Sequence, residues 1–352
     1  MTREMPAVAR VVVRPPNWLG DAVLALPSIA AVRRQFPEAA LTIAAPASVA
    51  PIFRERSAAA PDDVVDLPTA HREAIATLRN GQFDLGVLFP NSFRSAWQMR
   101  AAGIRERWGY PTSWRGGLLT RVSRRVRVKG PEHQADYYRA LVRGLDLECD
   151  DALPAVAPGA ASEGLAAKIL EQARVPPGAR LVGLAPGAAY GQAKQWPPAR
   201  VAALIARVVR ETGARCVIVG AAHDRDASRA IESWLRAEAP EALQSPRETG
   251  PSVIDLVGRT SLAALTGVIA RTSVFVSNDS GAMHLAAATG RPVVAIFGPT
   301  DERATRPLGD HDVIHESVFC RPCMLRDCPI DHRCMKRITV DRVFDAVRRR
   351  LG

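Results

Sequence analysis

The segment 278–284 of this 352-residue chain, Asn-Asp-Ser-Gly-Ala-Met-His, has the residue types of an anion site at the start of a helix. It leads from an apolar, strand-like run into an Ala-rich helical stretch. The first N–H groups of a helix and the positive end of its dipole attract anions, typically phosphate. Ser280 and Gly281 would expose such N–H groups, and Asp279 could accept a hydroxyl group or cap the helix. His284 falls on the first turn, where a buried, hydrogen-bonded histidine is the simpler interpretation.

A second loop, 186–197, follows another apolar run and has the sequence Pro-Gly-Ala-Ala-Tyr-Gly-Gln-Ala-Lys-Gln-Trp-Pro. The small residues Gly187 and Ala188 let a ligand approach the backbone closely, and Lys194 supplies a mobile positive charge. The Walker pattern G-x-x-x-x-G-K-[ST] is absent, so this loop is not a P-loop. Taken alone, Lys194 would be interpreted as an ordinary solvated lysine.

A third loop, Asn17-Trp18-Leu19-Gly20-Asp21, lies near the N-terminus. Gly20 permits a tight turn, and Asp21 falls at or near the N-cap of the next predicted helix. Capping alone would explain the aspartate. Its place at the end of the first predicted strand makes a catalytic carboxylate a fair competitor. No G-x-G-x-x-G follows this strand, so we expect no dinucleotide site here.

Alternating strand and helix patterns must position these loops. Strands are expected at 8–14, 41–45, 84–89, 181–185, 214–219, 274–277 and 292–297, and helices at 21–35, 133–145, 198–212, 224–237, 262–271 and 339–351. Nearly all-apolar strands separated by helices indicate parallel sheets covered on both faces. Because the chain is long for a single core, we expect an α/β fold of two Rossmann-like domains facing a central cleft, with ligands at the strands' carboxyl ends.

The domain boundary should fall between two breakers, the Pro- and Ala-rich stretch 155–158 and the Pro-Pro-Gly of 176–178. We place the N-terminal, acceptor-binding domain at 1–170 and the C-terminal, donor-binding domain at 171–335. The helix in 336–352 is expected to pack back on the N-terminal domain. Two of the three loops then lie on the second domain and form a metal-free diphosphate site, while the first domain carries a carboxylate. This combination favours group transfer from a nucleotide donor.

Composition narrows the class of protein. Hydrophobic residues make up 47% and charged residues 24% of the chain, as in globular proteins. No apolar run is long enough to span a bilayer, and residues 1–10 lack the apolar core of a signal peptide. We therefore expect a cytoplasmic protein.

Positive charge is concentrated in one segment of a chain whose net charge is +11. Between 94 and 129 a single acid, Glu106, accompanies Arg94, Arg100, Arg105, Arg107, Arg115, Arg121, Arg124, Arg125, Arg127 and Lys129. Trp97, Trp108, Tyr110 and Trp114 are interleaved with them. An Arg-rich solvated face is one interpretation. The other is a surface for an anionic partner, such as membrane headgroups or a phosphorylated acceptor, and no nucleic-acid-binding motif is present.

The three loops, taken in order, resemble those of the ADP-heptose:lipopolysaccharide heptosyltransferases, glycosyltransferase family nine. The forms N-W-L-G-D and P-G-A-x-Y-G-x-A-K-x-W-P are most similar to the heptosyltransferase II branch. The segments 90–95, 133–138 and 298–300 also match, so the resemblance covers almost the whole chain. It implies a GT-B fold and inverting transfer of heptose from ADP-L-glycero-D-manno-heptose to a heptosylated Kdo-lipid A acceptor, in assembly of the lipopolysaccharide inner core.

Roles for individual residues come with this resemblance. Asp21 matches the base that deprotonates the acceptor hydroxyl. Lys194 and the helix start at Ser280 and Gly281 would stabilise charge on the departing ADP, so that no metal cofactor is required. The remaining donor-site candidates are Gly187, Ala188, Asp224, Asp279 for sugar hydroxyls, and His284 for the diphosphate.

The implied acceptor is an anionic lipid, which gives the basic segment a partner. Asn17, Arg94, Arg124 and Arg125 are candidates for contact with the acceptor or the membrane. The resemblance places the enzyme peripherally at the inner face of the inner membrane, with no nucleic-acid partner.

A separate motif contains four cysteines, Cys320-x2-Cys323-x4-Cys328-x5-Cys334, with His332 nearby. In a cytosolic chain such a set favours a soft metal, here a structural zinc ion, over disulfides. Its spacing matches no standard zinc finger, and reduced or disulfide-paired cysteines in a surface excursion remain the alternative.

Other functions stay open. Another family nine enzyme could add the first or a third heptose. A GT-B nucleotide-sugar epimerase would need further acid and base residues, for which the sequence has no motif. A non-catalytic, metal-carrying nucleotide-binding regulator is disfavoured by Asp21.

Overall fold

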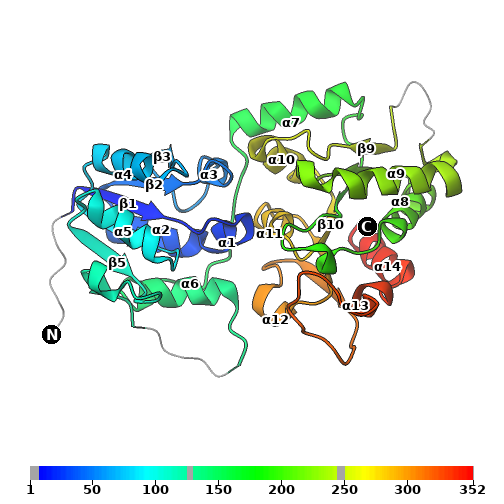
Figure 1. Cartoon of the computed structure of the whole chain (residues 1–352). Coiled ribbons are helices and arrows are strands. Elements are labelled where there is room, and N and C mark those ends of the chain that lie inside the picture. Colours follow the sequence, from blue (N-terminus) through cyan, green and yellow to red (C-terminus); the bar gives the residue numbers. More distant parts are fainter. Residues whose placement is uncertain (1–7, 125–129, 244–249, 352) are drawn as a thin grey trace. The chain divides into compact units, whose positions relative to one another are not determined.

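Two α/β units make up the chain, Met1–Ala155 and Val156–Gly352. The computed structural model describes residues 8–124, 130–243 and 250–351 (Figure 1). Arg125, Arg127 and Lys129 of the basic segment therefore lie outside the described residues.

The first unit is built on a six-stranded parallel sheet with the order β3-β2-β1-β4-β5-β6. Its strands are β1 (Arg10–Arg14), β2 (Ala40–Ala45), β3 (Asp63–Asp66), β4 (Leu85–Leu88), β5 (Glu106–Gly109) and β6 (Arg121–Val122). Its helices are α1 (Leu19–Leu24), α2 (Leu26–Gln35), α3 (Ala50–Phe53), α4 (His71–Asn80), α5 (Phe93–Ala101) and α6 (Gln134–Arg143). Helix α4 packs on α5, and α6 packs on α1 and α2. The single helix predicted at 21–35 is two helices, because Pro27 starts a new helix in the first turn of α2.

The second unit repeats the architecture with a parallel sheet of order β12-β11-β10-β7-β8-β9. Its strands are β7 (Leu181–Ala185), β8 (Arg215–Ile218), β9 (Val253–Asp255), β10 (Val274–Asn278), β11 (Val293–Phe297) and β12 (His311–His315). Its helices are α7 (Ala160–Gln172), α8 (Pro198–Thr212), α9 (Arg225–Glu238), α10 (Leu262–Ile269), α11 (Gly281–Ala288), α12 (Glu302–Thr305), α13 (Arg333–Lys336) and α14 (Val340–Leu351). Strands β7, β10 and β11 are buried along their whole length, as the predicted covering on both faces requires.

The point at which strand order reverses decides where ligands can bind. In the first unit the reversal lies between β1 and β4, and in the second between β7 and β10. Loops that leave neighbouring strands in opposite directions open a crevice at such a point. The loop with Asp21 follows β1, and the loops with Lys194 and Asp279 follow β7 and β10. All three predicted loops therefore leave strands that border a reversal point.

The units divide earlier in the sequence than the predicted boundary at 170/171. Helix α7 packs against α10 of the second unit, and this contact is close because Gly267 has no side chain. A Cβ atom at Gly267 would lie 2.2 Å from the carbonyl oxygen of Ser162. The breaker at 155–158, not the one at 176–178, therefore marks the link.

The C-terminal helix belongs to the second unit. Helix α14 packs on α8 and on β10, β11 and β12, with Val343, Phe344 and Val347 fully buried. The prediction that 336–352 packs on the N-terminal domain is wrong, because α14 packs within the core of the second unit. Across the described ranges, no helix is both long and apolar enough to cross a membrane.

Candidate functional site

A buried ion pair lies at the carboxyl ends of the central strands of the second unit. Lys194 Nζ lies 2.6 Å from Asp279 Oδ2, and the Thr300 hydroxyl donates to the same oxygen at 2.7 Å. The side chains of Lys194 and Asp279 are only 12% and 6% exposed. Three loops, after β7, β10 and β11, thus meet on one carboxylate oxygen. A charge pair in such a place is stable only while both partners are held together, because either charge alone would be left poorly solvated.

Lys194 is also fixed by an aromatic ring. Its Nζ lies 4.8 Å from the centre of the Tyr190 ring, on the face that attracts cations. The ammonium group is therefore not the freely moving surface charge that the sequence alone would suggest. It is a cation held between a carboxylate and a ring, which suits stabilisation of a second anion without reorganisation.

The start of helix α11 offers backbone donors beside this pair. Ser280 is the N-cap residue in an extended conformation, and its side chain makes no capping bond. Its hydroxyl lies 3.0 Å from that of Ser277 instead. Ser280 and Gly281 are half-buried, whereas His284, on the first turn, is 6% exposed. A helix start without a side-chain cap leaves N–H groups for an anion.

Asn278 joins the two donor-side loops, a role that the sequence did not reveal. Its Nδ2 donates to the carbonyl oxygen of Pro186 at 2.6 Å, and its Oδ1 accepts the backbone N–H of Trp196 at 3.2 Å. The side chain therefore ties both ends of the loop 186–197 to β10. The available signal was the pair of polar residues, Ser277 and Asn278, that ends a fully buried strand.

Gly187 and Asp224 lie against each other. A Cβ atom at Gly187 would lie 2.2 Å from Asp224 Oδ1, so only glycine fits there. Asp224 Oδ2 accepts the N–H of Ala221 at 2.9 Å, so one oxygen holds the turn before α9. Asp224 therefore lies against the loop that contains Gly187 and the buried Ala188. One of its two carboxylate oxygens is already used to hold the turn before α9.

Asp21 lies in the first turn of α1, in the first unit. Trp18, not Asp21, is the N-cap residue, so helix capping does not account for the aspartate. Its Oδ1 accepts a hydrogen bond from the Tyr138 hydroxyl at 3.0 Å. Tyr138 is 4% exposed and packs on Phe89 and Tyr137. Burial, and then the charge of Asp21, raise the pKa of Tyr138 above its usual range, so the hydroxyl remains a donor.

A buried arginine at the end of β1 is a second feature that the sequence analysis missed. Arg14 is 7% exposed and donates from Nη1 to Gln98 Oε1 at 2.9 Å. Burial, and then the charge of Arg94, lower its pKa to about 10. In the sequence, Arg14 looked like the polar end of an apolar strand.

Only part of the basic segment faces solvent. Arg115 is fully buried and donates to the carbonyl oxygens of Tyr110 and Pro90. Trp108 and Tyr110 are each 1% exposed and belong to the core. Fewer aromatic and basic side chains of this segment therefore share a surface than the sequence predicted. Those that the structure describes as exposed are Arg94, Trp97, Arg100, Arg105, Trp114 and Arg124, and Phe93, just before the segment, is exposed as well.

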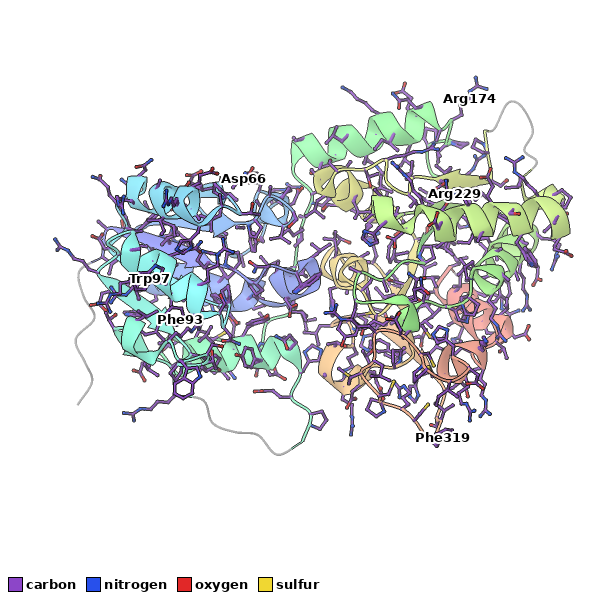
Figure 2. The ribbon with its side chains drawn as sticks, in the orientation of Figure 1. Asp66, Phe93, Trp97, Arg174, Arg229 and Phe319 are labelled. Atoms are coloured by element: carbon purple, nitrogen blue, oxygen red, sulfur yellow. The ribbon has the colours of Figure 1, made fainter. Side chains whose placement is uncertain are left out.

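Arg94 borders a hollow of about 540 Å³ that is lined by His71, Phe93, Arg94 and Trp97. Figure 2 labels Phe93 and Trp97. The rings of Phe93 and Trp97 stack with centroids 6.4 Å apart. Asn17 is exposed beside Trp18, which is 64% exposed. Arg124 is exposed next to the undescribed residues 125–129, where Arg125 lies.

The four C-terminal cysteines carry no disulfide. Among the residues that the structure describes, no group of three or more His, Cys, Asp or Glu side chains is placed to hold a metal ion. Zinc at Cys320, Cys323, Cys328 and Cys334 stays a prediction without a preformed ligand set. Of the other two cysteines, Cys216 is buried and Cys149 is partly buried.

Comparison with known proteins decides the family. The sequence model of glycosyltransferase family 9 (heptosyltransferase) matches residues 71–333. The chain belongs to this family. It is a glycosyltransferase, and the resemblance in its loops is confirmed.

Its relatives are similar over most of their length. The chain is 29% identical over 314 residues to lipopolysaccharide heptosyltransferase 2 of Escherichia coli, covering 85% of each chain. It is 28% identical to lipooligosaccharide heptosyltransferase 2 of Haemophilus influenzae, covering 85% of this chain and 86% of that protein. The solved structure of E. coli ADP-heptose lps heptosyltransferase II has a TM-score of 0.80 and 27% identity, over 97% of this chain and 98% of that one. The predicted GT-B class of fold is thereby confirmed.

Replacing Gly187 with alanine tests the packing of the donor-side loop. The new Cβ would meet the Asp224 carboxylate, so the loop must shift. We expect the free energy of unfolding to fall by about 1–3 kcal/mol, as at other overpacked sites. We also expect the affinity for ADP to fall by about tenfold or more, which corresponds to the loss of one good contact. Thermal unfolding and calorimetric titration with ADP measure the two effects. Gly164→Ala on α7 is the matched control, because nothing lies within 4 Å of its Cβ position. Unchanged ADP affinity in Gly187→Ala would contradict the assignment of this loop.

Proposed function

We propose that the enzyme transfers heptose, with inversion, from ADP-L-glycero-D-manno-heptose to a heptosylated Kdo-lipid A acceptor, in assembly of the lipopolysaccharide inner core. The observation that carries the proposal is the buried Lys194–Asp279 pair beside an uncapped helix start. The relatives named heptosyltransferase 2, and the ADP-heptose in the name of the similar E. coli structure, support the choice of sugar and donor.

The donor half of the proposal uses only residues of the second unit. The N–H groups at Ser280 and Gly281 bind the diphosphate, with His284 on the same turn. Lys194 stabilises the negative charge that builds up on ADP as the glycosidic bond breaks. Asp279, held by Thr300, accepts hydrogen bonds from sugar hydroxyls. The charges needed for departure of ADP come from side chains and backbone, so the proposed reaction requires no metal ion.

The acceptor half uses Asp21. Its carboxylate takes the proton from the acceptor hydroxyl while that oxygen forms a bond to the anomeric carbon. The bond from this carbon to the ADP oxygen breaks at the same time, and ADP leaves with the electron pair. A single displacement of this kind inverts the anomeric configuration. Because Asp21 and Lys194 belong to different units, transfer requires both units to contact the same pair of substrates.

Replacing Asp21 with asparagine should remove the base and leave the donor site intact. We expect turnover to fall by at least about a hundredfold, the usual contribution of a general base, with ADP affinity unchanged. The assay follows ADP release from ADP-heptose with a heptosylated Kdo-lipid A acceptor, in excess EDTA. Wild-type turnover by Asp21→Asn would refute the role of the base.

The choice of acceptor identifies the reaction within the family. The same assay with an acceptor that lacks heptose should give no ADP release. Faster release with that acceptor would instead identify an enzyme that adds the first heptose. Loss of all activity in EDTA would contradict the metal-free mechanism.

Replacing Tyr138 with phenylalanine tests how the base is oriented. The Tyr138 hydroxyl donates to Asp21 Oδ1 and so holds the carboxylate in one orientation. The variant should lose about tenfold in kcat, the scale of one hydrogen bond to a charged group. Tyr137→Phe is the control, since the Tyr137 hydroxyl bonds with Asn91 instead. Wild-type kcat in Tyr138→Phe would exclude the proposed orientation.

A lipid acceptor requires the enzyme to work at a membrane surface, and we place it at the inner face of the inner membrane. The exposed side of α5 suits this task. Phe93 and Trp97 are 46% and 44% exposed, and Arg94 and Arg100 are exposed on the same helix. Trp114, on the neighbouring loop, is 98% exposed. Aromatic rings favour the interface, and arginines favour anionic headgroups.

Reversing the charge of two arginines on α5 tests this membrane surface. Arg94→Glu combined with Arg100→Glu should weaken binding to vesicles rich in phosphatidylglycerol by more than about tenfold, since each basic residue near an anionic surface contributes measurably. Co-sedimentation measures the bound fraction. Arg229→Glu with Arg236→Glu, on exposed arginines of α9, makes the same change in net charge elsewhere and should bind like the wild type. Equal binding by all three proteins would rule out α5 as the membrane surface.

A further inference from the structure

The cysteine-containing segment 316–337 lies between β12 and α14 and includes the short helix α13 (Figure 1). It is a prominent sequence motif that the proposed reaction does not use, and Figure 2 labels one of its residues, Phe319. We propose that this segment positions the donor loop, through Cys328, His332 and Ala193, and that Cys328 is a modification site through which a thiol reagent weakens nucleotide binding. The inference rests on the proposed function only in taking Lys194 as part of the donor site.

Both backbone groups of Ala193, the residue before Lys194, bond to the segment. The Ala193 N–H donates to the carbonyl oxygen of Arg326 at 2.9 Å. The Ala193 carbonyl oxygen lies 2.7 Å from His332 Nε2, which must donate because the oxygen can only accept. The two bonds therefore fix the peptide group that carries Lys194 toward Asp279.

The contact extends along the donor loop. A Cβ atom at Gly191 would lie 2.4 Å from the Arg326 carbonyl oxygen, so the two backbones approach as closely as glycine permits. The Tyr190 hydroxyl donates to the Met324 carbonyl oxygen at 2.9 Å. The Tyr190 ring has Lys194 Nζ and the Arg326 guanidinium 4.8 Å and 5.1 Å from its centre. The ring that holds Lys194 is thus itself anchored on the segment.

The same segment holds the loop of Thr300, the other partner of Asp279. Arg321 Nε donates to the Gly298 carbonyl oxygen at 2.8 Å, and its Nη2 donates to that of Thr300 at 3.1 Å. The Met324 N–H donates to the Pro299 carbonyl oxygen at 3.0 Å. Both groups that bind Asp279 Oδ2 therefore come from loops that one segment joins.

Cys328 connects the solvent-exposed side of the segment to His332 and, through it, to Ala193. Its Sγ accepts the backbone N–H of His332 at 3.3 Å. His332 has a φ of 59°, in the left-handed region that costs energy for residues other than glycine. The bond to sulfur and the bond from the ring to Ala193 hold it there. Because Cys328 is exposed, a reagent can reach the sulfur. An adduct would displace His332 and, through Ala193, Lys194.

Variants of His332 test the link without touching the donor. His332→Ala should weaken ADP binding by about five- to tenfold, the scale of one lost hydrogen bond. His332→Gln should restore most of the affinity, because its terminal amide can donate to Ala193 O. Ile330→Ala, at an exposed side chain of the same segment, is the control and should bind ADP like the wild type. Titration calorimetry with ADP gives each Kd. Wild-type affinity in His332→Ala would overturn the inference.

Thiol labelling gives a second, independent measurement on the wild-type protein. If an adduct on Cys328 displaces His332 and so disfavours ADP, bound ADP should hold His332 against Cys328 and thereby slow the labelling. We expect N-ethylmaleimide to add to the Cys328 thiolate more slowly when ADP is present, as followed by peptide mass spectrometry. Cys149, in the other unit, should react at the same rate with and without ADP. In His332→Ala the protection of Cys328 should be lost, which separates coupling from simple occlusion by the nucleotide.

The outcomes distinguish this inference from the proposed function. If the wild-type protein does not bind ADP, the donor assignment fails. If the wild type binds ADP but labelling of Cys328 is unaffected, the positioning role fails and the transferase proposal stands. Should His332→Ala fail to fold, calorimetric titration of ADP into wild-type protein labelled at Cys328 still decides, because unchanged affinity there would overturn the inference.

Discussion

The proposed donor site of this enzyme depends on one constraint, the burial of a lysine and an aspartate as a pair. A cation on a flexible side chain can stabilise a leaving diphosphate only if it is already in place when charge develops. Asp279 and the Tyr190 ring hold Lys194 there, at the cost of enclosing two charges that must not be separated. The surrounding structure reflects that cost. Thr300 adds a second donor to the carboxylate, and Asn278 ties the lysine loop to the strand that carries the aspartate.

The position of both candidate sites follows from sheet topology. In each unit the strand order reverses beside the first strand of the unit, and polar loops follow the strands that border the reversal. The second unit places a cation and a helix start there, and the first places a carboxylate and buried Arg14. The same architecture therefore serves two chemical tasks, because the residues of the loops differ while the strands beneath them are alike. A carboxylate in one unit can change turnover without changing how the other unit binds a nucleotide.

Local patterns in the sequence predicted much of this arrangement. The central strands, the three loops and the order of Asp21, Lys194 and Asp279 follow from apolar runs and the small and polar residues after them. Side chains that act by contact between distant segments could not be predicted, such as Tyr138 on Asp21, 117 residues away. The burial of single side chains could not be predicted either. Trp108 and Trp114 both lie among basic residues in the sequence, yet Trp108 belongs to the core and Trp114 is almost fully exposed. The domain boundary was missed because the packing of α7 on α10 joins segments about a hundred residues apart, which no local pattern in 160–172 reveals.

A lysine differs from a metal ion in how it must be positioned. A metal ion is located by its own ligands, whereas the position of an ammonium group depends on the backbone that carries it and on a flexible four-carbon stem. An enzyme that uses lysine at the leaving group therefore needs rigid support for the loop itself. The segment 316–337 meets this need, since it bonds to both backbone groups of Ala193 and to the loop of Thr300. The segment is long and largely irregular because it must reach two loops that leave different strands. A single regular helix could not form backbone hydrogen bonds with both loops, since its own backbone groups are already paired.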